Sequence, residues 1–169
     1  DLAHLEELLS SSEKAIVSLM HGNNEIGNLL DLHAVGDLCE QYDALFHSDT
    51  VQTMGHYKHD ASALKVHFMV GAAHKFHGPK GIGFLYAKAG TKFNPLMYGG
   101  AQERNQRGGT ENVYGMVGIA KALELAYSSM DEHATYIKGL KSYFIEGLKK
   151  QFPGISFNGA SGDVENSLY

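Results

Sequence analysis

Residues 66–86 read VHFMVGAAHKFHGPKGIGFLY, and this stretch decides the fold of the chain. An apolar run at 66–70 ends in small residues, and a second apolar run at 82–86 begins after a Gly-Pro-Lys-Gly turn. The first run predicts a buried strand, and Lys75 then lies just past the carboxyl end of that strand. A lysine that is desolvated at such a strand end can act as a nucleophile. The alternative is an ordinary surface lysine in a turn, and the neighbouring elements have to decide between the two.

The composition is that of a globular protein. Of the 169 residues, 43% are apolar and 20% are charged, which is enough for one sizeable core. The formal net charge of −5 argues against nucleic-acid binding. No stretch is long and apolar enough to cross a bilayer, so we expect no membrane partner. The single cysteine, Cys39, cannot form an internal disulfide, which favours a reducing, cytoplasmic location.

Apolar periodicity predicts alternating strands and helices. Buried strands are expected at 15–20, 44–47, 66–70 and 82–86, and a further strand is expected to start at 155–157. Amphipathic helices are expected at 2–9, after an Asp31 N-cap, from Thr110 or Glu111 to Tyr127, and after an Asp131 cap. Cys39 falls on the apolar face of the second helix and is expected to pack in the core. This order predicts a three-layer α/β fold, a mostly parallel sheet with helical crossovers, followed by a long helix.

Polar side chains follow three successive strands of the predicted sheet. They are Asn23-Asn24 after the first strand, Asp49 with Gln52 after the second, and His74-Lys75 after the third. Because ligands bind at the carboxyl edge of such sheets, we expect these groups to converge. A lysine amine with an acidic partner suits pyridoxal phosphate, since the amine forms an imine with the aldehyde and the carboxylate keeps the pyridine nitrogen protonated. From the residues alone, a structural salt bridge between Asp49 and Lys75 is the alternative.

The ten histidines have to be considered as metal ligands. His47, His56 and His59 lie near one another in the sequence, but their spacing matches no helical or knuckle-type ligand set. We therefore expect no metal site. A glycine- and arginine-rich segment at 97–110 has the composition of an anion-binding loop, although it lacks the spacing of a nucleotide P-loop.

Four motifs, in this order, resemble those of the cysteine desulfurases. They read MHGNNEIG at 20–27, HSDTVQ at 47–52, HKFHGPKG at 74–81, and GGAQER at 99–104 continuing into GTEN at 109–112. Cysteine desulfurases are pyridoxal-phosphate enzymes of the class V aminotransferase group with the fold-type I architecture. The resemblance covers essentially the whole chain and implies an internal segment of such an enzyme. Residues 1–128 would be the second half of the cofactor-binding large domain, and 129–169 the long linking helix and the start of a small C-terminal domain.

The resemblance also implies how three residues would hold pyridoxal 5'-phosphate. Lys75 would carry the cofactor as an imine and would be the catalytic residue. Asp49 would face the pyridine nitrogen, where a neutral amide would not stabilise the charged ring. Gln52 would hydrogen-bond the phenolate oxygen of the ring.

Further roles follow from the same resemblance. Val51 would pack on one face of the ring, and Asn24 would lie near the phenolate oxygen and the substrate carboxylate. His74 would help to hold the phosphate, and Thr110 would reach the phosphate bound by the neighbouring subunit of a homodimer. Ala72 departs from the family pattern, which usually has a serine three residues before the lysine. One phosphate hydrogen bond, worth about 1–2 kcal/mol, would then be missing.

The reaction implied is removal of sulfur from L-cysteine, which leaves L-alanine and a persulfide on an enzyme cysteine. The sulfur would pass to an acceptor protein or an iron–sulfur scaffold protein. Cys39 does not match the persulfide cysteine, which the resemblance puts beyond Tyr169, so the segment alone would be inactive. The alternatives are selenocysteine lyase or another class V aminotransferase activity, and a non-catalytic scaffold or interaction protein that keeps the fold.

Overall fold

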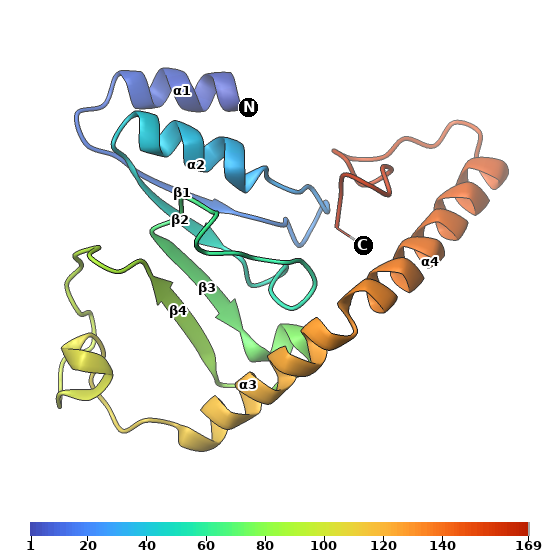
Figure 1. Ribbon diagram of the computed structural model, residues 1–169. Helices are drawn as coiled ribbons and strands as arrows, with labels where there is room; N and C mark the ends of the chain where they lie inside the picture. Colours follow the sequence, from blue (N-terminus) through green and yellow to red (C-terminus); the bar gives the residue numbers. More distant parts are fainter. Residues whose placement is uncertain (169) are drawn as a thin grey trace.

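The computed structural model describes residues 1–168, which form one four-stranded sheet and four α-helices (Figure 1). The strands are β1 Ile16–Met20, β2 Leu45–Asp49, β3 Phe68–Ala72 and β4 Gly83–Ala87. The helices are α1 Leu2–Ser10, α2 Leu32–Gln41, α3 Val113–Ser128 and α4 Met130–Gln151, with short 3-10 turns η1 Ala73–Phe76 and η2 Gln102–Asn105. Among the described residues, no helix combines the length and apolar character that crossing a bilayer requires.

The sheet is mostly parallel, with the strand order β1-β2-β3-β4. β1, β2 and β3 run parallel, and β4 runs antiparallel to β3. The helix α2 forms the crossover between β1 and β2. Met20 pairs with Asp49, and Asp49 pairs with Val70, so the carboxyl ends of the three parallel strands lie side by side. The predicted α/β class with a long helix is thereby confirmed.

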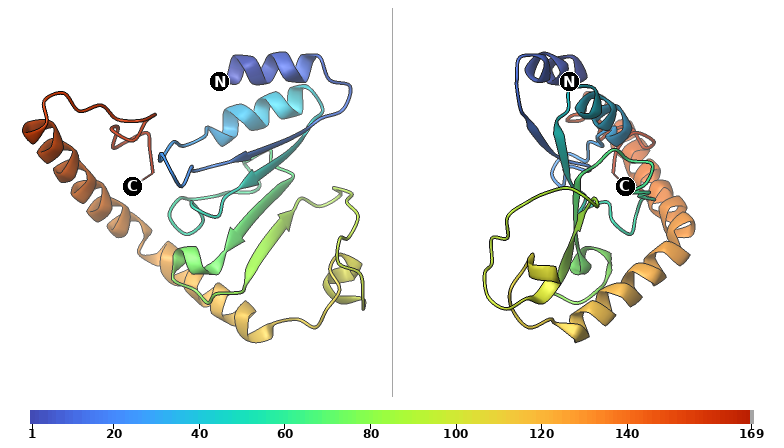
Figure 2. Two further views of the ribbon diagram at one scale, coloured as in Figure 1. Left: turned by 180° about the vertical axis from the view of Figure 1, so that it is seen from behind. Right: turned by 60° about the vertical axis from the view of Figure 1, so that its left-hand side comes forward.

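One face of the sheet carries the core. Val17, Phe46 and Met69 of the three parallel strands are buried with Cys39 of α2 in one apolar cluster. Phe84 of β4, on the same face by its pairing register, packs in a second cluster against α3. Figure 2 shows α2, α3 and α4 on this side of the sheet and the segment between β4 and α3 on the other side. The described residues therefore supply a sheet and one helical layer.

The opposite face of the sheet is open over the described residues. Ile16 of β1 and Leu85 of β4 lie on it and are 63% and 52% exposed. Between them, the Ser18 hydroxyl and the His47 Nδ1 atom form a hydrogen bond of 2.8 Å at the surface. The second helical layer expected of a three-layer fold is thus not formed by residues 1–168.

The start of α2 follows the sequence prediction closely. The Asp31 carboxylate accepts hydrogen bonds from the N–H groups of His33 and Ala34, both at 3.0 Å, as an N-cap residue does. Cys39, one turn from the end of α2, is fully buried, as predicted from its place on the apolar face. Burial raises the pKa of its thiol to about 11, so it acts as a small apolar core residue.

Three local predictions differ from the structure. The helix α3 begins at Val113 rather than at Thr110 or Glu111, because Asn112 is the N-cap and accepts the Gly115 N–H at 3.0 Å. The prediction of an Asp131 cap is wrong, since α4 begins at Met130 and Asp131 lies inside its first turn, where a carboxylate favours the positive helix end. The strand at 155–157 is also wrong, because this segment pairs with neither edge of the sheet among the described residues.

Candidate functional site

Backbone hydrogen bonds join the loops that follow β1, β2 and β3. The N–H of His21, just after β1, donates to the carbonyl of Asp49 at 2.9 Å. The N–H and hydroxyl of Thr50, just after β2, both donate to the carbonyl of Val70, at 3.2 and 2.7 Å. These contacts extend the parallel ladder beyond the strands, so the three loops leave the sheet as one connected edge.

Asp49 is the last residue of β2 and lies at this edge, half-buried. Its carboxylate accepts the N–H of Val51 at 2.9 Å, which fixes the direction of the side chain by a local turn. Val51 and Gln52 follow in the same turn and are also half-buried. The three residues predicted from the HSDTVQ motif are therefore held together by one short turn.

Lys75 lies on the 3-10 turn η1, which follows β3 directly. Ala73 and Phe76 of this turn are buried and anchor it, whereas His74 and Lys75 are exposed. The anchor is tight, because a Cβ atom added to Gly78 would lie only 2.8 Å from the Ala73 Cβ. Packing thus holds the backbone of η1 in place while the side chains of His74 and Lys75 stay accessible. Neither side chain makes a polar contact in the described part of the chain.

The β2 loop and η1 lie in direct contact. The His56 ring donates from Nε2 to the carbonyl oxygen of Lys75 at 3.1 Å, and burial lowers the pKa of this imidazole. A Cβ atom added to Gly55 would lie 2.8 Å from the Phe76 Cβ, so only glycine allows this approach. The turn that carries Asp49 therefore runs on to contact the backbone of Lys75.

Lys75 also lines a groove of about 540 Å³ at the junction of α3 and α4. His56, Phe76, Met130 and His133 also line it. The residues that line this groove do not include Asp49. The loops thus bring Asp49 and Lys75 to the same edge of the sheet, although this groove is not shared by their side chains.

Asn24 lies at the exposed tip of the loop after β1. The loop is closed by backbone hydrogen bonds between Asn23 and Asn28, at 2.9 Å, and between Gly27 and Asn23, at 3.0 Å. The side chain of Asn24 donates to the Glu25 carboxylate at 2.8 Å. Thr110, by contrast, lies in the segment before α3 and is exposed, and within residues 1–168 it forms no hydrogen bond with these loops.

A half-buried histidine pair at the same edge was not predicted. The Nδ1 atom of His21 lies 2.9 Å from the Thr53 hydroxyl and 3.0 Å from the Nε2 atom of His59. Burial, and then the charge of His59, lower the pKa of His21 to about 4, and burial lowers that of His59. The pairing spans 38 residues, so no local spacing could have indicated it. In the described part of the chain, no group of three or more His, Cys, Asp or Glu side chains suits a metal ion.

The comparisons with known proteins agree with this geometry. The family model described as aminotransferase class-V matches residues 1–168. The chain is 44% identical to the cysteine desulfurase IscS of Dictyoglomus turgidum over 144 residues, which are 85% of this chain and 36% of that protein.

The chain is also similar in fold and sequence to solved structures. The NifS-like protein of Rickettsia africae is 35% identical with a TM-score of 0.88, over 99% of this chain and 46% of that one. The structure described as SspA in complex with cysteine is 30% identical with a TM-score of 0.70, over 73% of this chain and 36% of that one. The chain thus spans less than half the length of these proteins.

Proposed function

Because the chain belongs to the aminotransferase class-V family, we propose that it is part of a pyridoxal-phosphate-dependent cysteine desulfurase. The observation that carries this proposal is the connected edge of three strand-end loops, which holds Asn24, Asp49 and Lys75. Residues 1–128 would form the second half of the cofactor-binding domain, and 129–169 would lead into a small C-terminal domain.

The side chains at this edge fit pyridoxal 5'-phosphate. Lys75 offers an exposed amine, and the Asp49 carboxylate keeps acceptor capacity beyond its one bond from Val51. Gln52 offers an amide donor in the same turn. When bound, the cofactor acts as an electron sink for the substrate carbon that bears the amine. The chain's own residues would hold it: the Lys75 amine would bind the aldehyde carbon, the Asp49 carboxylate would keep a proton on the ring nitrogen, and the Gln52 amide would donate to the phenolate oxygen.

Further residues would complete the binding of the ring, the phosphate and the substrate. Val51 would cover one face of the ring, and the exposed imidazole of His74, next to Lys75, would bind the phosphate. Asn24 would donate to the phenolate oxygen and to the carboxylate of the substrate. Ala72 comes directly before η1 and has only a methyl side chain, so it offers no hydroxyl that could hydrogen-bond the phosphate.

A homodimer is supported by exposed apolar side chains around Thr110. Leu96 and Tyr98 before it are 93% and 82% exposed, and Tyr114 and Val117 after it are 92% and 65% exposed. Apolar surface of this extent indicates an interface. Thr110 would then reach the phosphate bound by the partner subunit.

The substrate would be L-cysteine, and the products L-alanine and an enzyme persulfide. A similar protein was solved in complex with cysteine, which supports this choice. The persulfide sulfur would pass to an acceptor or iron–sulfur scaffold protein, in the cytoplasm. Cys39 is not the sulfur carrier, because its thiol is buried and its pKa is raised to about 11.

The test is the release of sulfide and alanine from L-cysteine by the intact enzyme that contains this chain. Lys75→Ala should lower kcat by about a thousandfold or more, because the nucleophile is lost. Asp49→Asn should also lower kcat strongly, because an amide does not hold the ring proton. Lys80→Ala, an exposed lysine in the same segment, is the matched control and should keep normal activity.

Each outcome of this test has a clear meaning. Sulfide release by Lys75→Ala at the normal rate would refute the proposal. Activity of the unmodified enzyme with L-selenocysteine but not with L-cysteine would favour a selenocysteine lyase instead. The absence of both activities, together with normal folding, would favour a scaffold protein.

A further inference from the structure

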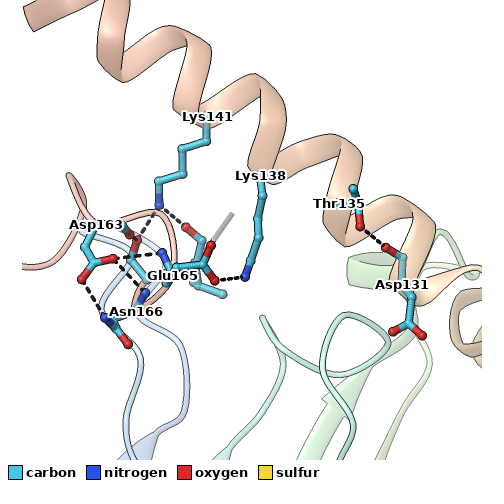
Figure 3. A network of polar contacts seen from close by, with 9 residues as sticks. Asp131, Thr135, Lys138, Lys141, Asp163, Glu165 and Asn166 are labelled. Carbon is cyan, nitrogen blue, oxygen red and sulfur yellow. Dashed lines mark hydrogen bonds and ion pairs between the residues drawn. The ribbon is translucent and has the colours of Figure 1, made fainter.

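Two lysines on one face of α4 reach the segment that follows the helix (Figure 3). The Lys138 ammonium lies 2.6 Å from the Glu165 carboxylate. The Lys141 ammonium, one turn further along, donates to the Ser167 hydroxyl and to the Leu168 carbonyl, both at 2.5 Å. The Lys138 pair is an exposed ion pair of little energetic weight, whereas Lys141 is half-buried and binds two oxygens that are shielded from water.

A tight turn prepares these oxygens for Lys141. The Asp163 carboxylate accepts the N–H groups of Glu165 and Asn166, at 2.9 and 3.2 Å, and the Asn166 amide at 2.7 Å. The Ser167 hydroxyl donates to the Asp163 carbonyl and accepts from the Lys141 ammonium, so it is hydrogen-bonded both as donor and as acceptor. Without the Lys141 ammonium, the Ser167 hydroxyl oxygen, in a residue that is only 1% exposed, would lose the hydrogen bond that it accepts.

The same segment is paired with the loop after β1. The Leu168 N–H donates to the Gly27 carbonyl at 2.7 Å, and Ser167 forms an antiparallel bridge with Asn28. The Asn28 amide oxygen also accepts the Ala160 N–H at 2.7 Å. The end of the described chain therefore acts as a partner strand for residues 27–28, as Figures 1 and 2 show where the last segment returns to the β1 loop.

Residues 27–28 also close the loop that carries Asn24. The Asn23 N–H donates to the Asn28 carbonyl, and the Gly27 N–H donates to the Asn23 carbonyl. Leu168 fills the space below this loop, because a Cβ atom added to Gly22 would lie 3.0 Å from the Leu168 side chain. A chain of contacts thus leads from Lys141 through Leu168 and Gly27 to the loop that carries Asn24.

We propose that Lys141 is a positioning residue, which latches segment 163–168 onto the β1 loop and thereby fixes Asn24 for substrate binding. The role of Asn24 in this statement rests on the proposed function, whereas the latch itself does not. The latch couples α4 to the loop that carries Asn24, although the side chain of Asn24 itself is hydrogen-bonded to Glu25 and not to α4 in the described residues.

The first experiment measures hydrogen exchange of the intact, cofactor-free enzyme by mass spectrometry. Lys141→Met keeps the aliphatic length of the side chain and removes the charge. We expect amides in peptides that cover 21–31 to exchange about tenfold faster or more, as loss of a charge-assisted hydrogen bond implies. Peptides that cover β2 should be unchanged. Lys150→Met is the matched control, since Lys150 is exposed on the same helix.

The second experiment measures steady-state kinetics with L-cysteine. A loosened Asn24 should raise KM about fivefold or more while kcat stays within about twofold, because binding rather than chemistry is affected. Simple loss of folded protein would lower the apparent kcat at constant KM. Ser167→Ala removes one acceptor and should give the same split to a smaller extent, which keeps the test open if Lys141→Met folds poorly.

The outcomes separate the two proposals. Unchanged exchange at 21–31 in Lys141→Met would refute the latch. Faster exchange with an unchanged KM would refute the positioning role. An unmodified enzyme that is inactive with L-cysteine would instead refute the proposed function, whatever the exchange data show.

Discussion

The half-buried pair of His21 and His59 predicts that the protein loses stability in weak acid. His21 is hydrogen-bonded to Thr53 and His59 at the edge of the sheet, and its pKa is lowered from 6.5 to about 4, chiefly by burial. The perturbation is therefore a change of pH from about 7 to about 5, with no change in sequence. At the lower pH, His21 is mostly protonated in the unfolded chain and mostly neutral in the folded chain, because its pKa is lower in the folded state.

The sign and size of the effect follow from this difference in pKa. The contribution of a neutral His21 to the free energy of unfolding is fully present above pH 6.5. It is lost as the pH falls through the interval from 6.5 to about 4. With 1.36 kcal/mol for each pKa unit, the complete loss is about 3 kcal/mol, and about 2 kcal/mol of it occurs by pH 5. The lowered pKa of His59 acts in the same direction.

The assay is denaturant unfolding of the cofactor-free protein at both pH values. His21→Asn should flatten the pH dependence of the unfolding free energy, because the titrating group is gone. His4→Asn is the matched control, since His4 is exposed on α1 and should leave the dependence unchanged. The reasoning is refuted if the natural protein is equally stable at both values, or if His21→Asn retains the full pH dependence.

Three further predictions concern a tight contact at η1, a hydrogen bond between two strand-end loops, and the core thiol of Cys39. Gly78→Ala should lower the free energy of unfolding by about 1–3 kcal/mol and weaken cofactor absorbance, because the new methyl group would lie 2.8 Å from the Ala73 Cβ; normal thermal unfolding would contradict this. Thr50→Val should cost about 0.5–1.5 kcal/mol in denaturant unfolding, since the half-buried Val70 carbonyl loses the 2.7 Å hydrogen bond from the hydroxyl and keeps only the one from the Thr50 N–H; a neutral result would show that the hydroxyl bond is dispensable. Cys39, with a raised pKa of about 11, should react with iodoacetamide about a hundredfold slower in the folded than in the unfolded protein; equal rates would mean that the thiol is accessible.

The predictable part of the structure is encoded locally. The strands appear as short apolar runs, and the Asp31 cap and the burial of Cys39 follow from neighbouring residues. The candidate residues Asn24, Asp49 and Lys75 could be predicted together because each lies at or just after the end of a strand, and parallel strands bring such residues to one edge. Their individual roles stay predictions.

The missed features depend on contacts between distant segments. His21 and His59 are 38 residues apart and meet only through the register of β1 and β2. Lys141 meets Leu168 only because the chain turns back at Asp163. The apolar residues at 155–157 were also not enough to predict a strand, because among residues 1–168 no strand of the sheet lies beside this segment to pair with it.

The role of Lys75 is tested most directly by chemical trapping. The intact enzyme is loaded with pyridoxal 5'-phosphate and reduced with borohydride, and the modified lysine is identified by peptide mass spectrometry. We predict that the modified peptide carries the cofactor on Lys75, and that Lys75→Ala yields none. Modification of another lysine instead, or of no lysine in a protein that still desulfurates cysteine, would contradict the assignment.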